Sequence, residues 1–175
     1  MVAVSLKKQR AVPALRRRPR PELLRFLACV DVLIHIDGHI GLFEYCLATL
    51  QAAKDGGADI LVLCDTNGGT MPHEVFQLTK LVGEKLGLPV GIHPHDDCGL
   101  GVANALAAVA SGACQVQGTI NGYGERVGNC NLTTLIPTLQ AKKGIPVVPD
   151  LTRLREISRF VDELANVPQD IRAPY

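Results

Sequence analysis

No stretch of this sequence approaches the roughly 18 consecutive apolar residues that a membrane span requires. No apolar run with a small-residue cleavage site follows the basic N-terminal segment, so a secretory signal also lacks support. The 175 residues are 47% hydrophobic and 20% charged, which suffices for one ordinary domain with a sizeable core. We therefore expect a soluble, cytoplasmic, globular protein that does not act at a membrane.

A CxxC pair is also missing, although the sequence contains six cysteines. They stand sixteen or more residues apart and have no secretory context, which argues against both a disulfide framework and a thiolate zinc site. We expect reduced thiols that fill positions in the core or near a functional site. These residues are Cys29, Cys46, Cys64, Cys98, Cys114 and Cys130.

Acidic residues are absent before Glu22, whereas seven of the eighteen Lys and Arg residues fall there. The remainder carries eleven basic and seventeen acidic residues, a net charge of about six negative units. Such a basic leader is compatible with a nucleic-acid-binding arm or a targeting peptide. We favour a solvated, disordered segment over residues 1–27 that has no function of its own, and we expect no nucleic-acid partner.

From about residue 28, short apolar runs alternate with polar loops and amphipathic stretches of about fifteen residues. Nearly continuous apolar strands separated by helices predict a parallel sheet, either doubly wound or of TIM-barrel type. The predicted strands cover 27–36, 59–63, 89–92 and 113–117, and the predicted helices cover 42–55, 72–86, 100–110, 132–142 and 151–165.

The positions of the polar residues favour the barrel. Polar groups follow three predicted strands directly, at 65–68, 93–97 and 121–131, and TIM barrels build their active sites from the loops after their strands. A complete barrel has eight βα units, and we count about four. The sequence therefore predicts an α/β fold with a partial TIM-type barrel over residues 28–143, followed by the start of a helical linker over 144–175.

His93 and His95 lie two positions apart at the end of a predicted strand, so both imidazoles project from the same side and can reach one ion. The alternative is a pair of hydrogen-bonded histidines in a buried strand. Asp96 and Asp97 follow directly and could orient the imidazoles or bind the ion themselves. Their alternative role is to cap the next helix.

Two loops between predicted strands and helices are rich in glycine and polar residues. The loop at 121–131 contains three glycines, which permit close approach of a ligand, but it matches neither a Walker A nor a Rossmann fingerprint. The loop at 64–69 could instead form an Asx-type turn and a helix cap. Neither loop alone identifies a function.

Together, three segments over residues 37–175 resemble, in order and spacing, the second half of the catalytic barrel of citramalate synthases. This family belongs to the superfamily of isopropylmalate synthase, homocitrate synthase and hydroxymethylglutaryl-CoA lyase. The segments are LVLCDTNGGTMPHEV, GIHPHDDCGLGVANALAAVASGACQVQGTINGYGERVGNCNL and ELANVPQDIRAPY.

The resemblance implies an acyltransferase that condenses acetyl-CoA with a 2-keto acid in branched-chain amino-acid biosynthesis. D-T-N-G-G and N-G-Y-G-E-R are similar to the citramalate branch, which favours pyruvate as the acceptor. The implied cofactor is a divalent metal (Mn, Mg or Zn). The implied roles are metal binding by His93, His95 and Asn129, their support by Asp96 and Asp97, substrate binding by Asp65, Thr66 and Asn121, and catalysis by Glu125.

The sequence departs from the family at several positions. Residues 31–38 align with the family segment D-A-E-H-F-F-D-G but place Leu33 and Ile34 where a Glu and a His are expected. Asp96 replaces an Asn, and residues 1–27 contain no counterpart of the family's first metal-binding Asp and its neighbouring Arg. The region that contributes a further catalytic His in relatives does not occur before Tyr175.

Three hypotheses therefore stay open. The chain is part of a citramalate synthase, part of an enzyme of the 2-isopropylmalate synthase type that uses another 2-keto acid, or an inert half-barrel that needs a complementary chain. We expect pyruvate and acetyl-CoA as small-molecule partners, and either a homo-oligomer or a complementary barrel half. The chain alone is expected to be inactive.

Overall fold

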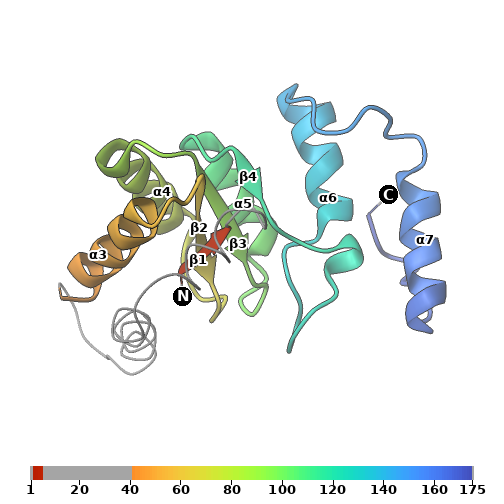
Figure 1. Cartoon of the computed structure of the whole chain (residues 1–175). Coiled ribbons are helices and arrows are strands. Elements are labelled where there is room, and N and C mark those ends of the chain that lie inside the picture. The colour runs from red at the N-terminus through yellow and green to blue at the C-terminus, as the bar shows by residue number, and fades with distance from the viewer. Residues whose placement is uncertain (1, 6–40, 175) are drawn as a thin grey trace.

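The computed structural model describes residues 2–5 and 41–174, which form a four-stranded sheet with helices packed beside it (Figure 1). The order of the strands is β1-β2-β3-β4. β2 pairs in parallel with β3, and β3 in parallel with β4, whereas β1 pairs antiparallel with β2. The strands are β1 Val2–Ser5, β2 Ile60–Asp65, β3 Val90–Pro94 and β4 Gln115–Val116.

Each parallel strand leads into a helix, so the chain repeats a βα unit. α3 packs against α4 and α4 against α5, while α6 and α7 lie beyond β4 (Figure 1). The described strands form an open, largely parallel sheet with helices between its strands, as expected for part of an α/β barrel. The helices are α3 Gly41–Asp55, α4 Pro72–Leu86, α5 Gly101–Ala110, α6 Leu132–Pro137 and α7 Leu154–Ala165.

α4 spans the predicted residues because its ends are marked in the sequence. Pro72 occupies the start of the helix, where its missing N–H costs nothing. The Glu74 carboxylate accepts a hydrogen bond from the Met71 backbone N–H at 2.8 Å. Gly87 ends the helix in the left-handed conformation, with φ of 63°.

Other elements differ from the predictions. The helix expected over 132–142 is α-helical only to Pro137, and Thr138–Lys142 form a π-helical turn, because proline removes a backbone donor and clashes with the preceding turn. The strand expected over 113–117 is shortened to two residues. Val2–Ser5 form a strand inside the segment predicted to be disordered. The strand predicted at 27–36 lies outside the described residues.

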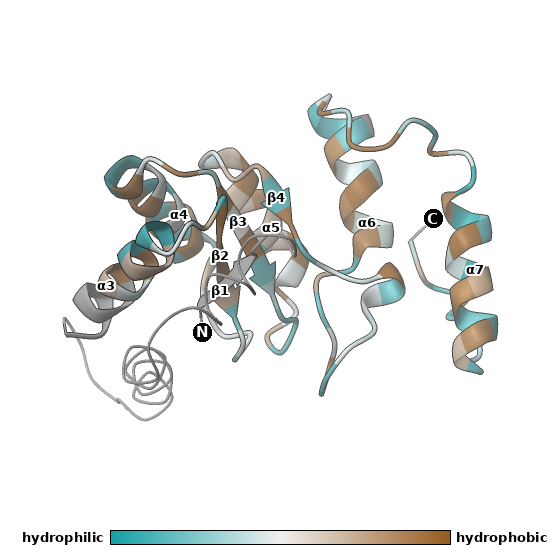
Figure 2. Cartoon of the chain, in the orientation of Figure 1, coloured by the Kyte–Doolittle hydropathy of each residue, from teal (hydrophilic) through white to brown (hydrophobic). Residues whose placement is uncertain are grey.

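The two faces of the parallel strands have different surroundings. Leu61, Val90 and Ile92 are almost completely buried in the hydrophobic clusters beneath the helices. Hydrophobic residues run along β2 and β3 (Figure 2). Because side chains alternate along a strand, Gly91 and His93 project from the opposite face. That face would line the interior of a closed barrel.

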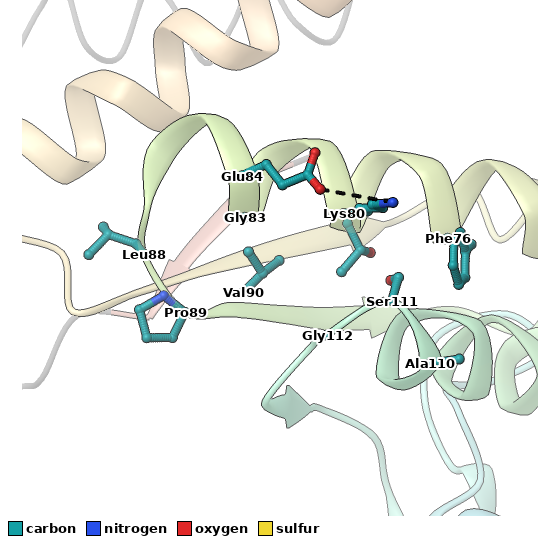
Figure 3. Close-up of a pocket in the computed structure, with 11 residues that line it drawn as sticks. Phe76, Lys80, Gly83, Glu84, Leu88, Pro89, Val90, Ala110, Ser111 and Gly112 are labelled. Atoms are coloured by element: carbon teal, nitrogen blue, oxygen red, sulfur yellow. Dashed lines mark ion pairs between the residues drawn. The ribbon is translucent and has the colours of Figure 1, made fainter.

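A groove of about 380 Å³ lies between α4 and α5 (Figure 3). Its lining includes Phe76, Pro89 and Gly112, and the Lys80–Glu84 ion pair, at 3.9 Å, belongs to its wall. These residues surround the amino end of β3, whereas the polar loops follow the carboxyl ends of the strands. TIM-type active sites use the carboxyl ends, so this groove is not the candidate site. Among the helices described, none is long and apolar enough to cross a bilayer.

Truncation of Leu61 tests the assignment of the core. Leu61 has no exposed surface, so Leu61→Ala should lower the free energy of unfolding by about 2–5 kcal/mol through lost burial and a residual cavity. Leu78→Ala is the matched control, because Leu78 is 38% exposed and should cost about 1 kcal/mol or less. Urea denaturation followed by circular dichroism measures both values. Equal losses would contradict the core described above.

Candidate metal and substrate site

The two histidines of the H-x-H motif lie at the carboxyl end of β3. Their ring centroids are 5.2 Å apart, with the planes at 60°. The parallel register pairs His93 with Cys64 on β2, and the backbone N–H of His95 donates to the Asp65 carbonyl at 3.2 Å. His95 is 7% exposed. Both imidazoles therefore sit on the inner face of the sheet, as their spacing predicted.

Asn129 reaches the same place through backbone pairing. It forms an isolated antiparallel bridge with His95. The N–H of Cys130 donates to the Pro94 carbonyl at 2.9 Å, and the N–H of Asp96 donates to the Gly128 carbonyl at 3.1 Å. Side chains paired across an antiparallel bridge lie on the same face. The structure thus brings together the three residues expected to bind a metal.

Three polar atoms in this region are buried and have no hydrogen-bond partner among the described residues. They are His93 Nδ1, Asn129 Oδ1 and Thr66 Oγ1. A buried polar atom left without a partner costs about 1–3 kcal/mol, so each needs an explanation. Imidazole nitrogen and amide or hydroxyl oxygen suit divalent cations. The imidazole of His93 and the amide oxygen of Asn129, together with the imidazole of His95, therefore fit a divalent cation.

The set is incomplete within the part of the chain that the structure describes. No group of three or more His, Cys, Asp and Glu side chains there could hold an ion. Two imidazoles and one amide carry no negative charge to offset that of the cation. Any charged ligand to such an ion would come from outside these three residues.

Arg126 spans the space between the loops. Its guanidinium donates two hydrogen bonds to the Asp97 carboxylate, at 2.7 and 2.8 Å, and one to the Thr66 carbonyl at 2.6 Å. Its Nη2 also lies 3.2 Å from His95 Nδ1. Because a guanidinium has no acceptor, Nδ1 of His95 accepts in this arrangement. The two hydrogen bonds from the Arg126 guanidinium to the Asp97 carboxylate, called the fork below, hold the pKa of Asp97 below its ordinary value.

The carboxylates of Asp96 and Asp65 both accept hydrogen bonds from backbone N–H groups a few residues further along the chain. Asp96 Oδ1 accepts from the N–H of Gly101, the first residue of α5, at 2.6 Å, although Leu100 and not Asp96 occupies the N-cap position. Asp65 Oδ2 accepts from the N–H of Thr70 at 3.2 Å, and its carbonyl accepts from Gly68. Support of the imidazoles by Asp96 and substrate binding by Asp65 stay predictions.

Asn121 is turned toward α6 and α7. Its Oδ1 accepts from the hydroxyls of Thr133 and Ser158, at 3.0 and 2.7 Å. Its Nδ2 donates to the Ser158 carbonyl at 2.9 Å and to Asp162 at 2.5 Å. These bonds use both ends of the Asn121 amide in holding the loop to the helices, and substrate binding by Asn121 stays a prediction. The residue has a left-handed φ of 60°, and the motif does not indicate where its side chain points.

Glu125 lies at the surface of the same loop. Its side chain is 80% exposed, and the ion-pair contact described for it is with Arg126 Nη1 at 3.7 Å. No described contact holds its carboxylate beside the histidines. Its catalytic role stays a prediction.

Of the cysteines, Cys130 meets the expectation of a buried thiol. It has no exposed surface and packs with Ala105 and Leu135. Burial, with a smaller contribution from Asp96, raises the pKa of its thiol to about 12, so it is not a thiolate ligand. Cys98 and Cys114 are exposed, so neither fills the core, but Cys98 follows Asp97 in the loop beside the candidate site. Cys29 and the side chain of Cys46 lie outside the described part.

Sequence reasoning missed the structural parts played by Arg126, Tyr123 and Asp162. Arg126 and Tyr123 lie inside the motif N-G-Y-G-E-R, but a motif does not show which groups its side chains contact. Asp162 shares the buried face of α7 with Leu154 and Ser158, four residues apart in turn. That helical spacing was the available signal.

Residues 37–161 match the sequence profile of the HMGL-like family. The chain belongs to the HMGL-like family. It is 52% identical over 142 residues to the (R)-citramalate synthase of Aquifex aeolicus, covering 79% of this chain and 27% of that protein. It is 37% identical to the 2-isopropylmalate synthase of Methanocaldococcus jannaschii, covering 71% of this chain and 24% of that protein. The resemblance drawn from the motifs is confirmed.

The chain spans about a quarter of the length of these curated relatives. Among solved structures, the chain superposes on HMG-CoA lyase of Bacillus subtilis with a TM-score of 0.66 at 22% identity, covering 74% of this chain and 46% of the other. It also superposes on the carboxyl transferase domain of Rhizobium etli pyruvate carboxylase, solved with pyruvate and biocytin. That TM-score is 0.63 at 25% identity, with 76% and 23% covered. At 22% identity, the similarity to HMG-CoA lyase shows the fold alone.

Replacement of Arg126 tests the fork on Asp97. In Arg126→Met, the pKa of Asp97 should rise toward its ordinary 3.8, because the donors that stabilise its carboxylate are gone. Because the pKa of Asp97 is lower in the folded than in the unfolded chain, its ionised carboxylate stabilises the folded protein at pH values above the ordinary pKa. This stabilisation is lost as the pH falls through the pKa of the folded protein. The variant should therefore have less acid sensitivity below pH 3.8 than the parent.

Carboxyl NMR over a pH titration measures this effect. Arg153→Met is the control, because Arg153 pairs with Glu156 on α7 and should leave the Asp97 titration unchanged. An Asp97 pKa that is the same in Arg126→Met and in the parent would contradict the described fork.

Proposed function

We propose that this chain supplies the histidine-bearing part of the active site of a citramalate synthase, which joins the methyl carbon of acetyl-CoA to the keto carbon of pyruvate. Curated (R)-citramalate synthases are 43–52% identical to the chain, and the 2-isopropylmalate synthases are 37–40% identical. The structural neighbour solved with pyruvate supports a keto-acid substrate. The chain covers only part of each relative, so it would contribute one portion of the enzyme.

One observation carries this proposal. Two imidazoles and an amide lie on one face at the carboxyl end of β3, and His93 Nδ1 and Asn129 Oδ1 are buried there without partners. A divalent cation held by His93, His95 and Asn129 would supply Lewis-acid polarisation of the keto group. Mn, Mg and Zn are all compatible with these donors.

Substrate orientation is assigned to the loop after β2. The Thr66 hydroxyl is buried and has no described partner, and it can donate to a carboxylate or a keto oxygen. Arg126 holds the backbone of Thr66 from the other side. Since this guanidinium is already paired with Asp97, its role toward substrate is to fix the loop.

The reaction also needs a base to remove a proton from the acetyl methyl group, and a water to release the product from CoA. Glu125 is the candidate base within the motif, but its carboxylate is solvated in this structure. We propose that a complementary part of the barrel closes over the loop, and that it also brings the missing charged metal ligand. In a cytoplasmic enzyme, that part would come from a second copy or from a complementary barrel half.

Two other functions remain candidates. Relatives at 37–40% identity are 2-isopropylmalate synthases, so this activity is one alternative. A comparison of pyruvate with 2-ketoisovalerate as the acceptor separates it from citramalate synthase activity. Because the described sheet is open, an inert half-barrel is the other alternative. Release of CoA, followed with a thiol reagent, should stay at background for the chain alone. Turnover of about 1 per second or faster, as in ordinary enzymes, would contradict an incomplete site.

Metal binding tests the proposed ligands directly. The purified chain should bind one divalent ion, and the double variant His93→Ala/His95→Ala should lose this binding, because it removes both imidazoles. Equilibrium competition with a chromophoric chelator measures the affinity. His73→Ala is the matched control, since His73 is exposed on α4. An affinity unchanged in the double variant would contradict the ligand assignment.

A further inference from the structure

α7 turns polar residues toward the body of the protein and apolar residues toward solvent. Ser158 and Asp162 are 8% exposed, whereas Phe160 and Leu164 are 57% and 71% exposed. A helix at the surface of a globular protein normally buries its apolar stripe. Apart from Leu154, the buried residues of α7 are therefore polar, and their side chains contact the loop that carries Asn129.

Asp162 anchors that loop at two points. Its Oδ1 accepts from the Tyr123 hydroxyl at 2.6 Å and from Asn121 Nδ2 at 2.5 Å. A buried carboxylate is costly unless it is hydrogen-bonded, so these two bonds hold it in one arrangement. The hydrogen bond from the Tyr123 hydroxyl to Asp162 is the main reason why the pKa of Tyr123 lies above its ordinary value.

Tyr123 in turn orients the side chain of Asn129. Its backbone carbonyl accepts from Asn129 Nδ2 at 3.1 Å and from the Thr119 hydroxyl at 2.5 Å. A carbonyl only accepts, so the amino end of the amide must face Tyr123. Oδ1 is then directed away from Tyr123 and is the buried atom without a described partner. A Cβ on Gly124 would collide with the same amide, which leaves Asn129 little freedom.

We propose that Asp162, on the helix beyond the barrel, is a positioning residue for the metal site: it fixes Tyr123, and Tyr123 presents Asn129 Oδ1 to the cation. The proposal rests on the proposed metal function. Its consequence is that α7 belongs to the functional unit and is more than a linker.

The experiment compares divalent-metal affinity in Asp162→Ala, Asp162→Asn and Tyr123→Phe, using Mn²⁺ or Zn²⁺ and the chelator competition. Loss of groups that orient a metal ligand typically lowers affinity 10- to 100-fold, and we expect about tenfold for Asp162→Ala. Tyr123→Phe should also weaken binding, because it removes the hydroxyl and keeps the carbonyl. Asp162→Asn should stay within about threefold, since both bonds end on Oδ1, which the amide retains.

Glu156→Gln is the control, because Glu156 is an exposed carboxylate on the same helix that pairs with Arg153. All affinities are measured well below each variant's unfolding temperature. A parent-like affinity in both Asp162→Ala and Tyr123→Phe would overturn the proposal. So would an equal loss in Asp162→Asn and Asp162→Ala, because that would point to the charge and not to the hydrogen bonds.

Hydrogen exchange of residues 119–131 without metal separates this inference from the proposed function. If the parent chain binds no metal, the proposed function fails, and the exchange data still decide whether Asp162 orders the loop. Faster exchange in Asp162→Ala than in Glu156→Gln would support the positioning contact. Identical exchange in these two variants would overturn it.

Discussion

The arrangement of the site depends on one piece of backbone pairing, between the end of β3 and residues 128–130. The bonds from Cys130 to Pro94 and from Asp96 to Gly128 flank the bridge between His95 and Asn129. Without this pairing, Asn129 would belong to a loop with no fixed relation to the two histidines. Gly128 makes the close approach possible, because it has φ of 111° and a Cβ there would collide with the carbonyl of Gly122.

Around this pairing, hydrogen bonds of polar and charged side chains join the loops after β2, β3 and β4. Arg126 joins the loop after β4 to the loops after β2 and β3, through Thr66 and Asp97. The guanidinium and the carboxylate neutralise each other, so the fork adds little net charge beside the histidines. On the far side, Asn121 and Tyr123 bind α7. Such a network of hydrogen bonds orients side chains more specifically than apolar packing does, because each bond requires a particular donor and acceptor.

Local signals in the sequence account for the parts of this structure that could be predicted. Pro72 and Gly87 mark α4, and the period of two along a strand places His93 and His95 on one face. Contacts between distant residues could not be predicted in the same way. The bond between Asn121 and Asp162 joins residues 41 apart, and the left-handed backbone of Asn121 decides where its amide points. The π-helical turn after Pro137 depended on how a proline inside a helix is accommodated, which periodicity does not reveal.

The central claim is that His93, His95 and Asn129 share one cation. X-ray absorption spectroscopy of the Zn²⁺-loaded chain tests it most directly, because imidazole ligands give a distinct outer-shell scattering pattern. We expect two imidazoles in the coordination shell of the parent chain, and none in His93→Ala/His95→Ala. A shell with no imidazole, or one dominated by sulfur, would contradict it.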